Sequence, residues 1–356
     1  MSSANNVDYA YGPLVREIAG VLKSKRSVAI LTHNSADGDT LGSGLAMALA
    51  LEKLDKRVSL IYEEQIPDDL SVLPLYPGIL TYLPDDGEGA SERAFESIHE
   101  RVLERRNTSE LDRVCERGWD AIVVMDTADV KLLGKRARLL EQSGCVINVD
   151  HHVTNMGFGT YNLIDADASA SAEIAYRLVL ALGVPLDRDI ALCIYTGICT
   201  DTGGFSYSNT SAECHEIAAK TLAFGLDVAH LRYKFFDQIS LGKLHCTGYV
   251  ANRLRFSKDG RHAVVVVPAS ALDELGADEA DCEGLVNIGR NVLGVEVSVF
   301  AREVKPGEFR INLRSRGEYD VAAVARKFDG GGHKLAAGCT IHAAPSDIEA
   351  ILFAAL

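Results

Sequence analysis

The sequence has little that would tie it to a membrane, a disulfide scaffold or a zinc knuckle. None of its eight cysteines forms a C-x-x-C pair, and such scattered cysteines are typical of reduced, buried thiols. No apolar run reaches the roughly 18–20 residues that a membrane-spanning helix needs, and residues 1–12 lack the charged start and apolar core of a signal peptide. We therefore expect a soluble, cytoplasmic protein with no membrane partner.

Basic residues are also fewer than acidic residues. Lys and Arg total 36 against 50 Asp and Glu, so the formal net charge is −14. An overall field of this sign repels long polyanions, which argues against long duplex DNA as a partner. Any nucleic-acid ligand is then expected to be short, or to be held by a local basic pocket.

The alternation of apolar runs and helical patterns predicts an α/β fold. Continuous apolar strands of the kind buried on both faces of a parallel sheet are predicted at 27–32, 57–62, 120–125 and 145–149. An Ala- and Leu-rich helix is predicted at 41–56, with Thr40 or Ser43 as the residue that caps its N-terminus. This alternation predicts an N-terminal domain with a mainly parallel sheet. The charged helical stretch 91–116 is predicted to be an insertion before the third strand.

A second β-rich pattern follows a helical region. It begins at residue 262, continues through 295–301 and 309–314, and ends in a Gly-rich turn at 330–332. Since 356 residues suffice for two domains at roughly 100–200 residues each, we predict a smaller C-terminal α/β domain. The predicted division is 1–240, a linker at 241–257 and 258–356.

Acidic and histidine side chains follow the predicted strands. They are His33, Asp37 and Asp39 after the first strand, Asp126 after the third, Asp150, His151 and His152 after the fourth, and Asp201 after a later apolar segment. Because the carboxyl ends of parallel strands share one edge of a sheet, where ligands bind, we expect these residues to converge. Taken singly, the Asp-Gly-Asp pattern is typical of a turn and a strand-end Asp of a helix cap. Their joint order favours one site.

The chemistry of this set favours a hard divalent cation. Oxygen and imidazole ligands without thiolates suit manganese or magnesium better than a structural zinc site. Asp37 and Asp39 flank Gly38 and can face neighbouring ions, while Asp126 can bridge them. Two ions about 3.5–4 Å apart activate a water and stabilise the charge that develops on phosphoryl oxygens.

These residues carry a family resemblance. The motif H-N-S-A-D-G-D-T-L-G-S at 33–43, the strand end at Asp126, D-H-H at 150–152 and T-D-T-G-G-F at 200–205 resemble the successive motifs of the DHH phosphoesterases. R-S-R at 314–316 and G-G-G-H-K-L-A-A-G at 330–338 resemble the DHH-associated C-terminal domain. Together the motifs span nearly the whole chain. The two-domain plan is similar to that of the nanoRNases, the bifunctional oligoribonuclease and adenosine-bisphosphate (pAp) phosphatase type.

The resemblance implies a role for each residue. One metal ion would be held by His33, Asp37 and Asp126, and the other by Asp39, Asp126, His151 and Asp201, with Asp126 as the bridge. His152 would face the scissile phosphate as a hydrogen-bond donor, and Asp150 would orient the loop. In the second domain, the residues implied for the substrate's terminal phosphate or a base are Arg314, Ser315, Arg316, Gly331, Gly332 and His333. Arginine and glycine backbone N–H groups suit an anion.

The resemblance also implies the activity. We expect a phosphohydrolase with two Mn²⁺ ions, or Mg²⁺ or Co²⁺, that degrades short RNA oligonucleotides to mononucleotides and dephosphorylates pAp. One alternative is a linear or cyclic dinucleotide phosphodiesterase acting on pApA or cyclic di-AMP, and another is a non-catalytic nucleotide sensor. An active site in the cleft between the two domains and a homodimer are further expectations from the family. Phe205 and Tyr207 are expected to pack in the core, with base stacking as the alternative.

Overall fold

The computed structural model describes residues 12–35, 37–62, 66–74, 79–81 and 118–356. It divides into two compact units, Met1–Gln238 and Ile239–Leu356, and each is described by itself. The predicted insertion at 91–116 lies outside the described residues. In the part of the chain that is described, no helix combines the length and the apolar character that crossing a bilayer requires.

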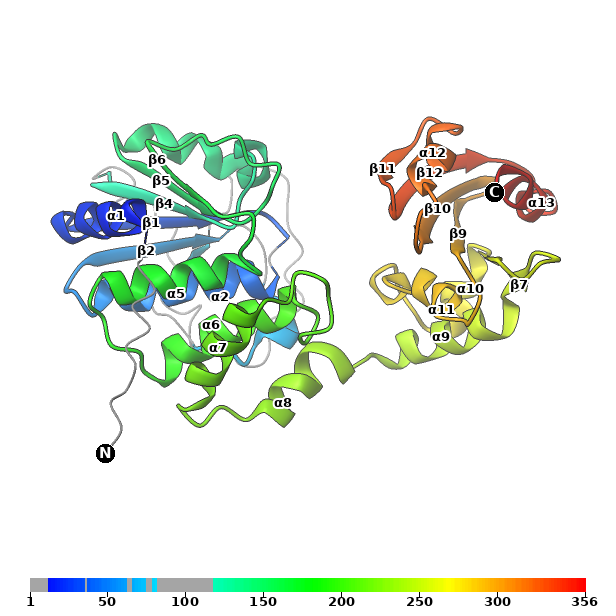
Figure 1. Cartoon of the computed structure of the whole chain (residues 1–356). Helices are drawn as coiled ribbons and strands as arrows, with labels where there is room; N and C mark the ends of the chain where they lie inside the picture. Colours follow the sequence, from blue (N-terminus) through cyan, green and yellow to red (C-terminus); the bar gives the residue numbers. More distant parts are fainter. Residues whose placement is uncertain (1–11, 36, 63–65, 75–78, 82–117) are drawn as a thin grey trace. The chain divides into compact units, whose positions relative to one another are not determined.

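The first unit is built on a parallel sheet of six strands in the order β3-β2-β1-β4-β5-β6 (Figure 1). The strands are β1 (Ser27–Thr32), β2 (Arg57–Tyr62), β3 (Ile79–Thr81), β4 (Ala121–Met125), β5 (Val146–Asp150) and β6 (Tyr161–Ile164). The central strands β1 and β4 are buried along their whole length, which explains why their sequences are continuously apolar. The predicted parallel α/β sheet is therefore confirmed.

Helices pack on both faces of this sheet. Among the described residues, the α-helices of the unit are α1 (Pro13–Ser24), α2 (Gly38–Glu52), α5 (Ser171–Ala181), α6 (Arg188–Asp201), α7 (Ala212–Leu222) and α8 (Val228–Arg232). Tighter 3₁₀ turns occur at η1 (Asp68–Leu70) and η2 (Val130–Gln142), and a wider π-helical turn occurs at η3 (Tyr233–Asp237). Alternate strand residues such as Ile30 and Val123 pack with α1, α2, α5 and α6. Their neighbours, including Leu31 and Val124, pack with Trp119 and η2 on the other face.

Helix α2 begins at Gly38, whereas the sequence pattern predicted a start at Leu41. Asp37 is its N-cap, because the Asp37 carboxylate accepts hydrogen bonds from the backbone N–H groups of Asp39 and Thr40. Thr40 and Ser43 therefore lie inside the helix. An Asp at the N-cap satisfies backbone donors that would otherwise lack partners, and here it also brings two carboxylates to the edge of the sheet.

The second unit contains a mixed sheet in the order β11-β12-β10-β9-β8-β7. Its strands are β7 (Arg255–Phe256), β8 (His262–Val267), β9 (Val297–Lys305), β10 (Glu308–Ser315), β11 (Gly331–His333) and β12 (Ala336–His342). On one face, Ile311 and Leu313 pack with α12 (Val321–Arg326) and α13 (Ile348–Ala355). On the opposite face, Phe300 belongs to a separate apolar cluster with the helices that precede β9.

Those helices include residues that the sequence pattern assigned to a linker. The stretch 241–257 contains helix α9 (Leu241–Arg253) and strand β7, both within the second unit. Ser240 caps α9, and Cys246 and Val250 are buried one turn apart. Two further helices, α10 (Ser270–Leu275) and α11 (Val286–Arg290), complete this layer. A single pair of apolar residues at this spacing is a weak sequence signal, which is why the helix was not predicted.

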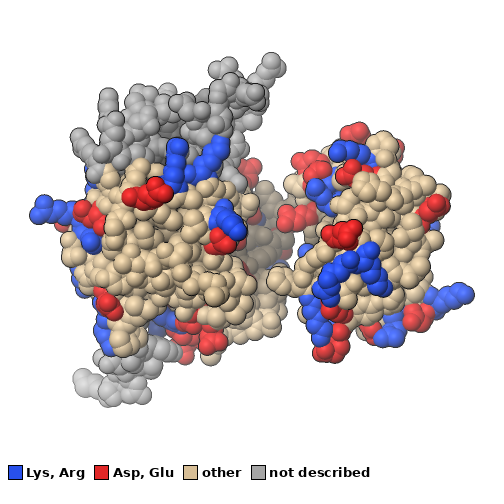
Figure 2. Space-filling model, turned by 90° about the horizontal axis from the view of Figure 1, so that it is seen from above, with Lys and Arg blue, Asp and Glu red and all other residues tan. Residues whose placement is uncertain are grey.

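Charged side chains are spread over the surface. On the side turned to the viewer in Figure 2, acidic and basic groups are interspersed on both units, with wide areas that carry neither. The net charge of −14 is therefore not gathered into one continuous acidic face in this view.

Candidate active site

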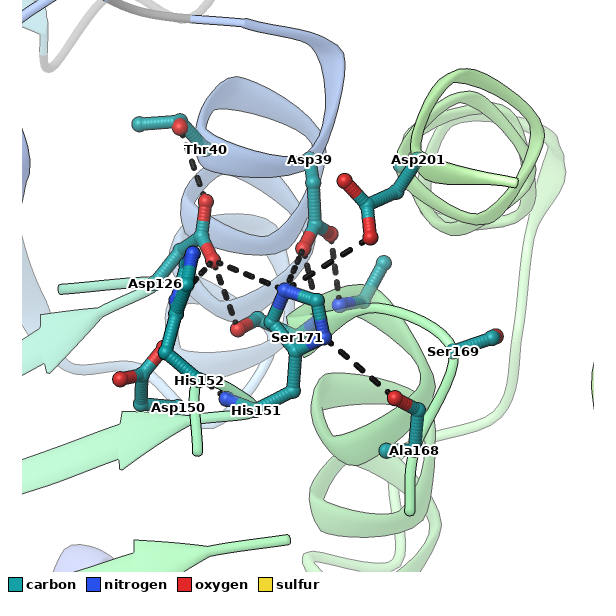
Figure 3. A network of polar contacts seen from close by, with 12 residues as sticks. Asp39, Thr40, Asp126, Asp150, His151, His152, Ala168, Ser169, Ser171 and Asp201 are labelled. Carbon is teal, nitrogen blue, oxygen red and sulfur yellow. Dashed lines mark hydrogen bonds and ion pairs between the residues drawn. The ribbon is translucent and has the colours of Figure 1, made fainter. Parts of the chain in front are cut away.

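The predicted residues come together at the carboxyl-terminal edge of the first sheet. β1 and β4 are neighbours, although the chain forms β2 and β3 between them, and such a reversal of strand order leaves a crevice outside the strand ends. In Figure 3, Asp39 comes from α2, Asp126 from the end of β4, His151 and His152 from the end of β5, and Asp201 from the end of α6.

Within the described residues, three groups of side chains have ligand atoms that all lie within 4.8 Å of one another. The groups are His33, Asp37 and Asp126; Asp126, His151 and His152; and Asp39, His151 and Asp201. Asp126 belongs to two of them. Its Oδ2 lies 3.4 Å from His33 Nε2, and its Oδ1 lies 3.7 Å from His151 Nε2. The two oxygens of one carboxylate therefore face different histidines, as a bridging ligand requires.

The Asp126 backbone is held in an unusual conformation. Its φ angle of 52° lies in the left-handed region, which costs energy for any residue with a side chain. Thr40 Oγ1 donates to Asp126 Oδ2 at 2.9 Å, and Ser171 Oγ donates to Oδ1 at 3.0 Å. One hydroxyl thus fixes each oxygen of the carboxylate. Neither hydroxyl is among the site residues that the sequence motifs predict.

Asp39 faces the N-terminus of α5. Its two oxygens accept hydrogen bonds from the backbone N–H groups of Ser171 at 2.6 Å and Ala172 at 2.8 Å, where the helix dipole favours an anion. The start of this helix is also held by Glu173, whose Oε2 accepts a hydrogen bond from the Ser169 hydroxyl at 2.8 Å. These two residues do not form an S-x-x-E capping box, so the sequence does not indicate which carboxylate the helix terminus meets.

Two histidines present the same ring nitrogen to the carboxylates. His33 Nδ1 donates to the Asn34 carbonyl, and His151 Nδ1 donates to the Ala168 carbonyl at 3.3 Å. This leaves Nε2 of each ring as the nitrogen that can bind a cation, since a backbone acceptor fixes the tautomer. His151 Nε2 also lies 3.6 Å from Asp201 Oδ2.

His152 is held by a carboxylate that is fully buried. Asp150 Oδ1 accepts from His152 Nδ1 at 2.8 Å and from the His151 backbone N–H at 2.9 Å, while Asn155 donates to Oδ2 at 2.6 Å. The hydrogen bond to Asp150 raises the pKa of His152 against the opposing effect of burial. The His152 side chain is 44% exposed, so its ring remains accessible. Asn155 was missed because an isolated Asn after a strand carries no special pattern.

The electrostatics of the cluster favour a cation. Burial, followed by the charges of Asp126 and Asp201, raises the pKa of Asp39 well above its usual range. Burial and neighbouring carboxylates also raise the pKa of Asp201 to about 6, although His151 opposes the shift. Burial would lower the pKa of His33, but its hydrogen bond and its proximity to Asp126 outweigh this and raise it to about 9.

The pKa of Asp126 is shifted in the opposite direction. Burial raises its pKa, but the hydrogen bond from His33 and the charges of His151 and His33 more than offset this and lower it. The cluster therefore keeps Asp126 charged and holds protons on its neighbours, because several carboxylates crowded together repel one another. A divalent ion can replace those protons. The donor set, with oxygen atoms and imidazole Nε2 atoms, fits Mn²⁺ or Mg²⁺.

The substrate-binding residues predicted in the second unit do not form one group. Arg314 lines a pocket of about 300 Å³ together with Arg310 and Asn312, whereas Arg316 lines another of about 630 Å³ with Arg261. The Ser315 side chain is buried and its hydroxyl donates to the Tyr319 carbonyl at 2.8 Å. Ser315 therefore stabilises the strand end and is not exposed to a ligand.

The Gly-rich segment forms an exposed edge strand. Gly331, Gly332 and His333 are exposed on β11 and pair with β12. A Cβ on Gly332 would lie 2.5 Å from the Ala336 carbonyl, so this glycine is required by the tight hairpin itself. His333 pairs with Ala336, which in turn pairs with Arg314. His333 and Arg314 therefore occupy one row of the sheet and share a face.

The two aromatic residues after Asp201 have different environments. Phe205 stacks on His215 with ring centroids 4.9 Å apart, in agreement with the predicted packing role. Tyr207 is 63% exposed, so the prediction of core packing is wrong for this residue. Its ring covers Gly203, where an added Cβ would lie 2.4 Å from Tyr207 Cζ.

Comparisons with known proteins agree with this architecture. Residues 27–198 match the DHH family, N-terminal domain, and residues 259–356 match the DHHA1 domain. The chain is 31% identical over 333 residues to the bifunctional oligoribonuclease and PAP phosphatase NrnA of Thermus thermophilus, which covers 93% of this chain and 89% of that protein. It is 27% identical to the protein of the same name from Bacillus subtilis, over 65% of this chain and 74% of that protein.

A solved structure supports the fold of both units. An exopolyphosphatase-related protein from Bacteroides fragilis has a TM-score of 0.78 and 26% identity, covering 99% of this chain and 97% of that one. The DHH match followed by the DHHA1 match, together with the relative that matches nearly the whole chain, settles the classification. The chain belongs to the DHH family, with a DHH N-terminal domain followed by a DHHA1 domain.

Proposed function

We propose that this protein is a metal-dependent phosphohydrolase that degrades short RNA oligonucleotides to mononucleotides and dephosphorylates pAp. The observation that carries the proposal is the position of Asp126, whose two oxygens face different histidines within two ligand groups. The match over 93% of the chain to a relative named as an oligoribonuclease and PAP phosphatase supports the choice of substrates. The net charge of −14 supports short substrates over long duplex DNA.

The proposed metal ligands form two sets that share Asp126. One set is His33, Asp37 and Asp126, and the other is Asp39, Asp126, His151 and Asp201. Two Mn²⁺ ions are proposed, with Mg²⁺ or Co²⁺ as substitutes. When bound, such ions activate a water and neutralise charge on the phosphoryl oxygens. Thr40 and Ser171 hold the shared carboxylate in place.

The protein's own groups position the substrate phosphate. His152, held through Nδ1 by Asp150, donates a hydrogen bond to an oxygen of the scissile phosphate. The raised pKa of His152 favours the protonated ring, which strengthens this hydrogen bond as negative charge grows on that oxygen. Asn155 keeps Asp150 in place by donating to its other oxygen.

The second unit is proposed to bind the remainder of the substrate. Arg314 and His333 share a face of the sheet, and the exposed backbone of Gly331 and Gly332 lies beside them. A guanidinium binds a phosphate through two parallel charge-assisted hydrogen bonds. Arg316 is proposed as a separate contact, since it lines a different pocket.

A comparison of substrates tests this proposal. Turnover with Mn²⁺ is measured for pAp, pApA, a ribopentanucleotide, an RNA of about 24 nucleotides and cyclic di-AMP, using wild type and Asp126→Asn. We expect fast release of mononucleotides from the short RNAs, phosphate release from pAp, little attack on the long RNA and no turnover by the variant. A preference for cyclic di-AMP would indicate the dinucleotide phosphodiesterase instead, and inactivity on all five would favour a nucleotide sensor.

A further inference from the structure

One face of the second sheet is covered by helices over only part of its width. Phe300 on β9 packs beneath the layer that contains α9, α10 and α11. Further along the same face, β10 carries Arg310, Asn312 and Arg314 at alternate positions, and these side chains are exposed or half-buried. Because the uncovered part of this face is polar, it can be exposed to water without a protein partner.

The strand register places small residues beside this polar row. Asn312 pairs with Gly338 on β12, which pairs with Gly331 on the edge strand β11. Arg314 pairs with Ala336 in the next row. Because paired residues on adjacent strands share a face, long cationic side chains on β10 stand next to a floor of glycine and alanine. A flat ring can pack against these small residues, and the longer arginine side chains can contact the same ligand.

Arg310, Asn312 and Arg314 line one pocket, in which the cationic excess is small because the lining also includes Arg302, Glu279 and Glu283. Arg302 on β9 is bound by Glu279 at 2.8 Å and is only 9% exposed. The same glutamate lies 3.9 Å from Arg310, which is 61% exposed. Since Glu279 is engaged with Arg302 at the shorter distance, Arg310 and Arg314 can bind another anion. The pocket volume of about 300 Å³ is at the lower end of the range for small-molecule sites.

We propose that Arg310, Asn312 and Arg314 form a subsite for one nucleotide unit of the substrate. Arg310 and Arg314 bind its phosphate, and the Asn312 amide hydrogen-bonds to its base or ribose, while the ring lies over Gly338. The inference rests on the proposed function for the identity of the ligand. It adds Arg310 and Asn312 as residues that determine affinity for the substrate end away from the scissile bond.

Binding to the metal-free protein tests the subsite separately from catalysis. The full-length chain is stripped of metal with EDTA and titrated with 5′-AMP and with adenosine in a calorimeter. Without metal, the acidic cluster of the first unit repels a phosphate, so binding reports the cationic subsite. We expect 5′-AMP to bind at least about tenfold more tightly than adenosine, because its phosphate makes charge-assisted hydrogen bonds that adenosine lacks.

A matched pair of variants identifies the residue. Arg310→Ala is expected to weaken 5′-AMP binding about tenfold and to raise KM for pApA by a similar factor with kcat unchanged. Arg326→Ala is the control: the Arg326 side chain is also 61% exposed and lies 3.6 Å from Asp320, but its helix α12 packs on the opposite face of the sheet. Asn312→Ala is expected to weaken adenosine binding as well as 5′-AMP binding.

The outcomes separate the subsite from the proposed function. If Arg310→Ala binds 5′-AMP as wild type does, or if wild type binds no 5′-AMP, the subsite is overturned even when short RNA is hydrolysed. If 5′-AMP binds in a manner that depends on Arg310 but no substrate is hydrolysed with Mn²⁺, the proposed function fails and the subsite stands.

Discussion

Removing the Thr40 hydroxyl is predicted to weaken metal binding without disturbing the fold. Thr40 is fully buried, and Oγ1 lies 2.8 Å from Asp37 Oδ1, 2.9 Å from Asp126 Oδ2 and 2.7 Å from His33 Nε2. It therefore touches all three residues of one proposed metal site. Thr40→Val keeps the shape of the side chain and removes only the polar atom.

The magnitude follows from the charge of the partners. A hydrogen bond to a charged group contributes roughly 1.5–3 kcal/mol, which is about tenfold to 150-fold in an equilibrium constant at about 1.4 kcal/mol per factor of ten. Loss of a residue that positions metal ligands typically costs about tenfold to 100-fold in metal affinity. The two estimates agree, so we expect Thr40→Val to bind Mn²⁺ about tenfold to 100-fold more weakly.

A matched variant in the same helix provides the control. Ser43 is also fully buried on α2, and within the described residues its hydroxyl has no hydrogen-bond partner. Ser43→Ala therefore removes a buried hydroxyl without touching a proposed ligand. Mn²⁺ affinity is measured by titration of both variants and wild type, with circular dichroism as a check on folding. If Thr40→Val binds Mn²⁺ within twofold of Ser43→Ala, the positioning role of Thr40 is refuted.

Three further predictions concern stability. Mn²⁺ at about 100 times its Kd should stabilise the protein by about 2.7 kcal/mol, so calorimetry should show a rise in Tm that EDTA reverses; an unchanged Tm would count against metal binding. Gly42→Ala should destabilise by about 1–3 kcal/mol in urea unfolding, because its Cβ would lie 2.4 Å from the Cys193 carbonyl. Gly20→Ala, with open space around it, should instead stabilise by about 0.5–1 kcal/mol, and equal effects would refute this packing argument. The backbone N–H groups of Arg26 and Ser27 lower the pKa of Asp120, so its stabilising effect is present above the ordinary Asp pKa and is lost as pH falls through the folded value. Asp120→Asn should therefore be less stable than wild type at pH 7, and the gap should close in acid; a gap that persists in acid would contradict this.

Much of the first unit could be predicted from its sequence. The continuous apolar runs at 27–32 and 120–125 are typical of strands that are buried on both faces of a parallel sheet, and the structure places them at the centre of such a sheet. Residues that follow such strands must lie at one edge of the sheet. The predicted convergence of His33, Asp126 and His151 therefore followed from the position of each residue in its own element, and the structure brings these side chains together.

Tertiary structure decided which side chains support that cluster. Ser171 and Asp126 are 45 positions apart, and Ala172 and Asp39 are 133 positions apart, so no local pattern can report either contact. Which carboxylate meets the start of α5 depends on how that helix packs against α2. Gly197 on α6 leaves room for the contact between Asp39 and Ala172, since an added Cβ on Gly197 would lie 2.5 Å from Ala172 Cβ and 2.6 Å from Asp39 Oδ1.

In the second unit, too, tertiary structure decided which side chains lie together. The motif at 314–316 suggested two arginines acting together, but Ser315 turns inward to the Tyr319 carbonyl, and Arg314 and Arg316 line different pockets. Arg310 lies outside this motif, yet the strand register places it on the same face as Arg314. Periodicity and spacing determined the elements and the order of the ligands, because these depend on the local chain. The partners of each side chain were decided by packing, because they come from segments that meet only in the folded protein.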